Sequence, residues 1–206
     1  MSAQFWPLVH AERAALAADL AGLDDAAWAT PSLCEGLSVR QVLAHITAAA
    51  NLNGPRWMIG VIKCRWDFDK QVAMRLAEQL GDSPAETYDR FRRSVASRTK
   101  PPLPVIAMLG ETVVHGEDIR RPLGISRAYP IDTLTRLAEY YCRSDLVVPG
   151  KSRVRGLRLE ATDGEFRTGE GPLVRGGTLA LVMATVGRTA YLDGLDGDGV
   201  AVLRGR

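Results

Sequence analysis

Glu111 and His115, four residues apart, are the first candidates for chemistry in this chain. On an α-helix, side chains with this spacing lie on one face, one turn above the other. The neighbouring residues are apolar nearly all round, which is typical of a buried helix. A carboxylate and an imidazole in such surroundings must be paired or must coordinate something. The pattern therefore favours a divalent metal site, with a third ligand supplied by another helix.

The spacing by itself is a weak indication of a metal site. With 24 Asp and Glu residues and 3 His residues in 206, an acid four positions before a histidine arises by chance in roughly one such sequence in three. A buried hydrogen bond between Glu111 and His115, with no metal, explains the same residues. Both interpretations stay open on this helix alone.

A second histidine, His45, lies in a comparable apolar setting. Ser38 followed by Gln41 is a capping-box pattern, so a helix is predicted to begin at Val39. His45 then shares a stripe of that helix with Val42 and faces the core. Such an imidazole either bonds to a backbone carbonyl or bridges to another helix through a metal, and small alanines nearby would let that helix approach.

Composition and charge are those of a globular protein, with 46% hydrophobic residues, 24% charged residues and a net charge of +2. The basic residues are scattered among acids, so the charge argues neither for nor against nucleic acid. We expect no nucleic-acid partner, because the sequence has no basic recognition helix with a turn motif before it. The longest apolar run, Thr178–Val186, is too short to span a bilayer, and no signal-peptide pattern opens the chain. We therefore expect a cytoplasmic protein without a membrane partner. The composition does not indicate an oligomeric state.

The three cysteines, Cys34, Cys64 and Cys142, are widely spaced and form no C-x-x-C motif. This pattern predicts neither a disulfide framework nor a thiolate zinc cluster. Cys34 is expected to be a small, buried apolar residue.

The order of predicted elements separates a helical part from a small mixed part. Helices are predicted over 5–22, from Asp24 to Trp28, from Val39, over 55–81 with breaks, over 83–99, up to Arg120, and over 133–145 with Asp132 as cap. The later elements are a strand over 156–162, a turn at Asp163-Gly164, a returning strand over 165–168, a helix over 178–192 and a last strand over 199–203.

Two stretches resemble the mycothiol-dependent maleylpyruvate isomerase family, which belongs to the DinB-like four-helix metalloproteins. They are Pro31-Ser-Leu-Cys-Glu-Gly-Leu-Ser-Val-Arg-Gln-Val-Leu-Ala-His45 and Glu111-Thr-Val-Val-His-Gly-Glu-Asp-Ile-Arg-Arg-Pro-Leu-Gly124. Gly187-Arg188 and Gly197-Asp-Gly-Val-Ala-Val-Leu203 are similar to the small C-terminal module of the same family. Leu37 stands where many members have tryptophan, a departure that concerns local packing.

The resemblance implies both a fold and a site. The fold is mainly α, with a DinB-like four-helix bundle over residues 1–148 followed by a small α+β module over residues 149–206. His45, Glu111 and His115 match the three metal ligands of the family, which usually binds zinc. Asp118 matches a recurrent acid near the metal, and Arg188 falls where the C-terminal module supplies a functional arginine.

The function that this resemblance implies is that of a metal-dependent thiol enzyme, with mycothiol or a similar small thiol as cosubstrate. Two histidines and one glutamate leave a coordination position open, where a metal would hold the thiol as its thiolate. In a cis–trans isomerase the thiolate would add to a conjugated double bond, allow rotation and leave. In an S-transferase it would stay on the small electrophilic substrate. In either case a cation such as Arg188 would hold a substrate carboxylate.

Two other functions fit the residues. One is a non-catalytic helical protein in which a metal only joins two helices. The other is a metal-free ligand-binding bundle in which Glu111 and His115 form a buried pair.

Overall fold

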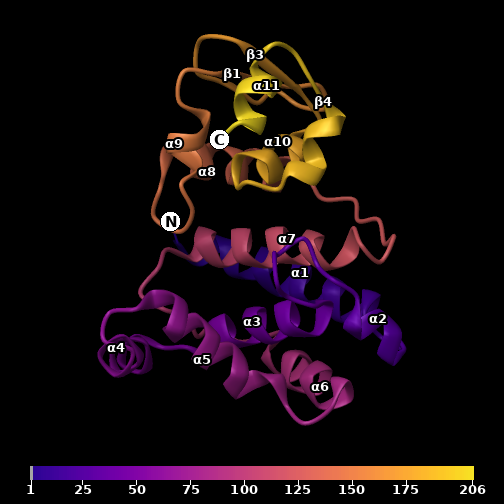
Figure 1. The fold of residues 1–206 in the computed structure, drawn as a ribbon, viewed down its shortest axis with the longest axis vertical. Helices are drawn as coiled ribbons and strands as arrows, with labels where there is room; N and C mark the ends of the chain where they lie inside the picture. The colour runs from indigo at the N-terminus through magenta and orange to yellow at the C-terminus, as the bar shows by residue number, and fades with distance from the viewer. Residues whose placement is uncertain (1) are drawn as a thin grey trace. The chain divides into compact units, whose positions relative to one another are not determined.

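The computed structural model describes residues 2–206, and the side chains from residue 4 onward. The chain forms two compact units, Met1–Arg127 and Ala128–Arg206, which are coloured from indigo through magenta to pink and from there through orange to yellow in Figure 1. None of the described helices is both long enough and apolar enough to cross a bilayer. Each unit is described by itself below.

The first unit is helical in the residues that the structure describes. Its elements are η1 (Ser2–Phe5), α1 (Trp6–Asp19), α2 (Asp25–Ala29), α3 (Val39–Asn51), α4 (Gly54–Lys63), α5 (Phe68–Leu80), α6 (Pro84–Ser94) and α7 (Val105–Arg120). Helices α1 and α3 each pack against both α6 and α7, which closes a four-helix bundle, and α5 adds to α3 and α6. The predicted mainly α, DinB-like bundle is confirmed.

The bundle core joins residues from five helices. They are Leu16 and Ala17 of α1 with Leu20 directly after it, Trp28 of α2, Val39, Val42, Leu43 and Ile46 of α3, Phe91 of α6 and Ile119 of α7. Full burial of a large apolar side chain contributes about 1.5–3 kcal/mol. Ile46 directly follows His45, and Ile119 lies one turn after His115. The same packing that stabilises the bundle therefore fixes the two helices that carry the histidines.

Helix α3 begins where its sequence predicts. The hydroxyl of Ser38 accepts a hydrogen bond from the backbone N–H of Gln41 at 3.4 Å, and Gln41 Oε1 accepts one from the backbone N–H of Ser38 at 2.8 Å. Two donors at the helix start are thereby satisfied. This reciprocal cap sets the first turn of the helix that presents His45.

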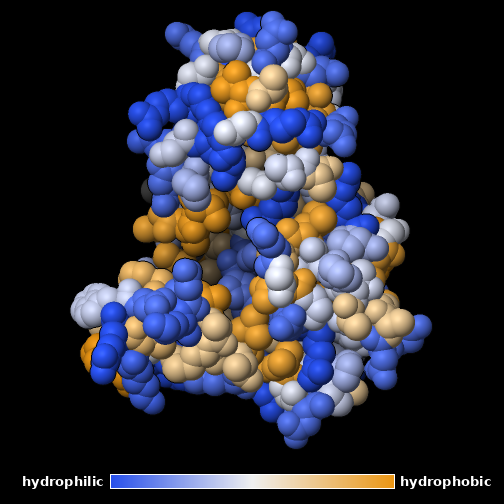
Figure 2. Space-filling model, in the orientation of Figure 1, coloured by the Kyte–Doolittle hydropathy of each residue, from blue (hydrophilic) through white to orange (hydrophobic). Residues whose placement is uncertain are grey.

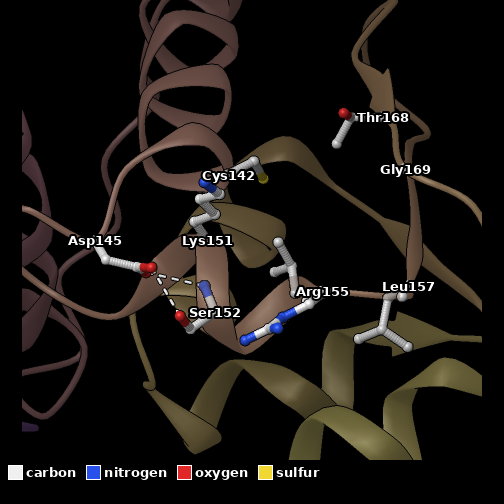
Figure 3. A pocket seen from close by; sticks show the side chains of 10 residues that line it. Cys142, Asp145, Lys151, Ser152, Arg155, Leu157, Thr168 and Gly169 are labelled. Atoms are coloured by element: carbon white, nitrogen blue, oxygen red, sulfur yellow. Dashed lines mark hydrogen bonds between the residues drawn. The ribbon is translucent and has the colours of Figure 1, made fainter.

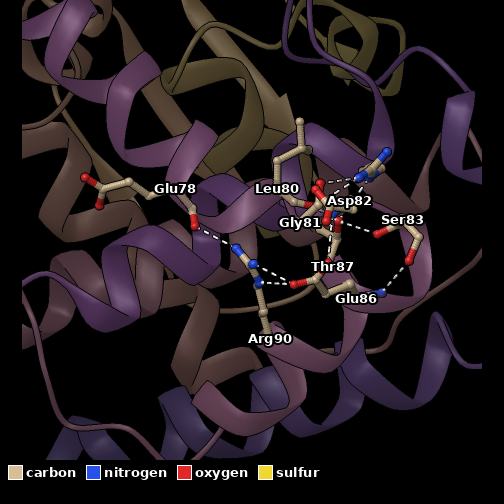
Figure 4. Close-up of polar contacts among 9 residues, drawn as sticks. Glu78, Leu80, Gly81, Asp82, Ser83, Glu86, Thr87 and Arg90 are labelled. Atoms are coloured by element: carbon tan, nitrogen blue, oxygen red, sulfur yellow. Dashed lines mark hydrogen bonds and ion pairs between the residues drawn. The ribbon is translucent and has the colours of Figure 1, made fainter.

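Arg40 ties the start of α3 to the turn between α5 and α6. Its Nη2 donates to the carbonyl oxygens of Leu80 and Gly81 at 3.0 and 2.9 Å, and its Nε donates to Thr87 Oγ1 at 3.0 Å. Figure 4 shows this turn, where Thr87 Oγ1 also donates to the carbonyl of Leu80. A guanidinium that satisfies several carbonyls fixes the position of α3 along its neighbours.

Large apolar side chains stay exposed around α4 and the start of α5. They are Met58, Ile59, Ile62, Trp66, Phe68 and Val72. Figure 2 shows apolar atoms gathering over these two helices. Arg65 and Trp66 join the helices with φ angles of 54° and 66°, a region that non-glycine residues seldom adopt. The surface formed by α4 and the start of α5 is therefore apolar and exposed to solvent.

The second unit combines helices with a small mixed sheet. Its elements are α8 (Ile131–Arg143), α9 (Gly150–Val154), β1 (Arg158–Ala161), β2 (Arg167–Thr168), β3 (Leu173–Gly176), α10 (Thr178–Thr185), η2 (Thr189–Gly194), β4 (Leu195–Asp196) and α11 (Gly199–Arg204). The strand order is β2-β1-β3-β4, with β1 and β3 parallel and the outer pairs antiparallel. Helix α8 packs on α9 and α10 within this unit, whereas the expected boundary at 148/149 groups it with the bundle.

The predicted last strand over 199–203 is wrong, because these residues form α11. Gly197, with φ of 103°, turns the chain out of β4. Gly199 and Leu203 are then buried four residues apart, as on a helix, while Val202 is partly exposed. A short apolar run cannot distinguish a strand from a helical turn by periodicity.

Helix ends differ from the predictions at three further places. Helix α8 begins after Pro130 without a side-chain cap, so Asp132 lies in its first turn, where a carboxylate favours the helix dipole. Helix α6 ends at Ser94 rather than near Thr99. The helix predicted over 178–192 is interrupted at Gly187, whose φ is 93°, and continues as the 3-10 helix η2.

Replacing the cap of α3 tests its contribution to stability. We expect Ser38→Ala to lower the free energy of unfolding by about 1 kcal/mol, because an N-terminal N–H loses its acceptor. Ser38→Thr, the matched control, keeps the hydroxyl acceptor and should lose less than about 0.5 kcal/mol. Urea unfolding followed by circular dichroism measures both. Equal stability of the alanine variant and the parent would show that the cap contributes nothing.

Candidate metal centre

Helices α3 and α7 bring three candidate ligands together. His45 on α3 and Glu111 and His115 on α7 each offer one donor atom, and these atoms lie within 4.8 Å of one another. The distance from His45 Nε2 to Glu111 Oε1 is 2.6 Å, and that from His115 Nε2 to the same oxygen is 3.7 Å. The residues that the sequence grouped from two separate motifs thus meet at one point of the bundle.

The two imidazoles approach Glu111 from different directions. Their ring centroids are 4.9 Å apart and their planes are inclined by 81°. The side chains of His45, Glu111 and His115 are 23%, 17% and 15% exposed. The cluster is therefore enclosed largely by protein while each side chain keeps some accessible surface. A metal-free pair would be Glu111 with His45, since the contact with His115 is too long for a hydrogen bond.

The second nitrogen of His115 is held by a carboxylate. His115 Nδ1 lies 2.8 Å from Oδ2 of Asp118, which is fully buried one turn further along α7. A carboxylate accepts a hydrogen bond from the protonated ring nitrogen. This contact assigns the proton to Nδ1 and leaves the lone pair of Nε2 toward Glu111, the tautomer of a metal-ligating histidine.

Cys34 also contacts this carboxylate, which differs from the expectation of a purely apolar role. Its Sγ donates to Asp118 Oδ2 at 3.0 Å and lies 3.4 Å from His115 Nδ1. The side chain is only partly buried. The sequence places Cys34 in a loop 81 residues before His115, so nothing in its local pattern indicated the contact.

Arg13 on α1 is a buried charge that the sequence analysis missed. Its side chain is 1% exposed, and its Nη1 donates to the carbonyl of Ser97 at 3.0 Å. Burial lowers the pKa of Arg13 to about 10, while the negative charge of Glu111 acts in the opposite direction. The spacing of Arg13 from the buried Val9 and Ala17, four residues away on either side, could have indicated its inward face.

Two ion pairs fix α1 against the end of α7 and the segment that follows it. Arg120 Nε donates to Asp19 Oδ2 at 2.7 Å, and the side chain of Arg120 is almost fully buried. Arg127 pairs with Glu12 at 3.1 Å. These contacts hold the C-terminal half of α7, on which His115 and Asp118 lie.

Arg188 belongs to the second compact unit. It precedes η2, and its Nη1 donates to the carbonyl oxygen of Val186 at 3.2 Å. Its expected role in holding a substrate carboxylate stays a prediction.

The second unit has a hollow of its own, of about 410 Å³. Figure 3 shows Lys151, Arg155 and Cys142 around it, with Asp145 accepting hydrogen bonds from the Ser152 N–H and hydroxyl at 2.9 and 2.7 Å. Burial raises the pKa of Cys142 to about 11, so this thiol stays protonated at neutral pH. Among the described residues, two groups of side chains could hold a metal, His45/Glu111/His115 and Cys34/His115/Asp118, and both lie in the first unit.

Removing the buried positive charge of Arg13 tests whether it balances the negative charge of Glu111. We expect Arg13→Met to lower the free energy of unfolding of the metal-free protein by about 2 kcal/mol. The substitution removes a charged hydrogen-bond donor to the carbonyl of Ser97 and the positive charge that balances Glu111. Arg92→Met is the matched control on an exposed helix face and should stay within about 0.5 kcal/mol of the parent. Urea unfolding in the presence of a chelator measures both. Equal effects of the two substitutions would contradict this role.

Comparison with known proteins gives one family and one fold. The family of mycothiol maleylpyruvate isomerase N-terminal domains matches residues 9–102, a range that includes His45 and ends before Glu111 and His115. No curated protein sequence matches the chain. Two crystal structures, of the mycothiol-dependent maleylpyruvate isomerase and of a histidine-to-alanine variant of it, share the fold. Each has a TM-score of 0.66 and 16% identity, over 96% of this chain and 93% of theirs. Residues 9–102 thus match the mycothiol maleylpyruvate isomerase N-terminal domain family, and the chain shares the fold of the mycothiol-dependent maleylpyruvate isomerase.

Proposed function

We propose that this chain is a metal-dependent enzyme that uses a low-molecular-weight thiol. The observation that carries the proposal is the convergence of His45, Glu111 and His115, whose donor atoms lie within 4.8 Å of one another. Two imidazoles and one carboxylate suit a divalent metal, zinc in the first instance. Three protein ligands leave a coordination position open, as in catalytic rather than structural zinc sites.

The residues present fit such a metal in their chemistry and their orientation. Asp118 accepts the Nδ1–H of His115, so the Nε2 lone pair is available to a cation. Glu111 lies between the two histidines, with its Oε1 2.6 Å from Nε2 of His45 and 3.7 Å from Nε2 of His115. In the absence of a cation, the hydrogen-bonding distance of 2.6 Å between His45 and Glu111 satisfies both groups. A divalent metal, when bound, would lower the pKa of a coordinated thiol.

The family of residues 9–102 supports a thiol as cosubstrate, and mycothiol is the first candidate. We propose cis–trans isomerisation of a small electrophile of the maleylpyruvate type, in which the thiol is recovered. S-transfer, in which the thiol stays on the product, is the second reaction that the same residues would serve. Arg188 is the proposed binding group for a substrate carboxylate, because a guanidinium matches that group in a bidentate manner.

Two of the protein's own thiols, Cys142 and Cys34, are poor candidates for the nucleophile. Burial raises the pKa of Cys142 to about 11, so this thiol stays protonated at neutral pH. Cys34 donates its hydrogen to Asp118. The proposal therefore assigns the nucleophile to a thiol from solution.

The partial exposure of all three ligands favours this proposal over a purely structural metal. Structural zinc sites are closed by four protein ligands. Here the ligand group consists of three residues, each with 15% to 23% of its side chain exposed. An accessible fourth position is what a thiol cosubstrate requires.

Metal content tests the ligand set. Protein purified without chelator or affinity metal should contain one zinc per chain by mass spectrometry, and His45→Ala and His115→Ala should lose it. His10→Ala is the matched control, since His10 contacts the carbonyl oxygen of Ser97 and lies outside the ligand group. The same metal content in all three variants, or none in the parent after loading with zinc, would contradict the site.

Turnover tests the reaction class. We expect zinc-loaded protein with mycothiol to convert maleylpyruvate to its trans isomer. Chromatography of substrate and product measures this conversion. Arg188→Ala should lower kcat/KM roughly 10- to 100-fold, the loss of one charged hydrogen-bonding group. Arg204→Ala, which removes an exposed arginine of the same unit, is the control. Recovery of the thiol indicates isomerisation and its consumption indicates S-transfer, whereas no thiol-dependent turnover of any electrophile tested would contradict the proposal.

A further inference from the structure

A loop before α3 is fastened to α7 at Asp118. The backbone N–H of Leu33 donates to the backbone carbonyl of Asp118 at 3.1 Å, and the thiol of the next residue, Cys34, donates to the Asp118 carboxylate at 3.0 Å. One loop thus contacts both the main chain and the side chain of the same buried residue. The backbone hydrogen bond from Leu33 therefore positions Cys34 near Asp118 independently of the thiol.

The loop also has its own framework. Ser32 Oγ accepts from the backbone N–H of Cys34 at 3.1 Å and donates to the carbonyl of Leu37 at 2.7 Å. The backbone N–H of Leu37 donates to the carbonyl of Cys34 at 3.0 Å. Because these bonds close the loop without the thiol, a change of the Cys34 side chain should leave the loop in place.

The thiol and the imidazole converge on a single oxygen. Asp118 Oδ2 lies 3.0 Å from Cys34 Sγ and 2.8 Å from His115 Nδ1, and the two donors are 3.4 Å apart. Two donors from different elements hold this oxygen in place more firmly than either donor would alone. The orientation of this oxygen in turn sets the orientation of the His115 ring.

We propose that Cys34 is a positioning residue of the metal centre. Its thiol holds the Asp118 carboxylate, which holds His115 with Nε2 directed at the ligand position. The inference rests on the proposed function, because it assigns Cys34 a role through a proposed metal ligand. Removing a partner in this outer layer of a metal site typically weakens metal binding by about 10- to 100-fold.

A direct ligand role for Cys34 is the competing assignment. Cys34, His115 and Asp118 also offer donor atoms within 4.8 Å of one another. In the structure, however, the sulfur and the ring nitrogen both face one carboxylate oxygen at hydrogen-bonding distances. That is the geometry of two donors sharing an acceptor, and it favours positioning over ligation.

Binding of cobalt(II) alone, without any added thiol, distinguishes these roles. Titration of the full-length parent, Cys34→Ala and Cys34→Ser with cobalt(II) gives an affinity and a visible d–d spectrum. We expect Cys34→Ala to bind cobalt roughly tenfold more weakly and with an altered d–d spectrum. Cys34→Ser keeps an O–H donor to Asp118, so it should restore the spectrum and an affinity within roughly threefold of the parent. Cys64→Ala is the matched control for loss of a thiol elsewhere.

Each outcome decides between the roles. A sulfur-to-cobalt charge-transfer band in the parent that disappears in both Cys34 variants would make Cys34 a ligand and overturn the proposal. Identical affinity and spectra in the parent and Cys34→Ala would also overturn it, while leaving the three-residue metal site intact. A parent that binds no cobalt at all would instead contradict the proposed function itself.

Discussion

A carboxylate and two imidazoles lie inside a helical bundle where water cannot solvate them fully. Polar groups in that position are costly unless each finds a partner. Helix α7 carries two of the three, and nearly all of its residues are buried. The surrounding structure compensates them in layers: His45 contacts Glu111, Asp118 contacts His115, and Arg13 supplies a nearby positive charge. These contacts position or balance the three groups.

The compensation comes from elements that are distant in the sequence. Helix α1 contributes Arg13 and the acidic partners of Arg120 and Arg127, while the loop before α3 contributes Cys34. The capping box and Arg40 fix the start of α3, the helix that carries His45 and packs against α7. A site that depends on several elements in this way tolerates little displacement, which is what a preorganised metal centre requires.

Local patterns in the sequence predicted the helix positions of the candidate ligands, whereas their grouping as a metal site came from the resemblance to the family. The spacing of Glu111 and His115, the cap at Ser38 and the apolar stripe around His45 each follow from helix geometry within a few residues. The contacts of Cys34 and Arg13 depend on tertiary packing over 80 or more residues, which no local pattern encodes. The error at 199–203 has a different cause, because a five-residue apolar run fits both a strand and a helical turn.

The most direct test of the account is a crystal structure of zinc-loaded protein with anomalous diffraction recorded on both sides of the zinc absorption edge. We expect one anomalous peak per chain, within about 2.0–2.2 Å of His45 Nε2, a carboxylate oxygen of Glu111 and His115 Nε2. Asp118 should still accept the Nδ1–H of His115. A peak held by other residues, or a fourth protein ligand that closes the site, would contradict the central claim of an open metal centre between α3 and α7.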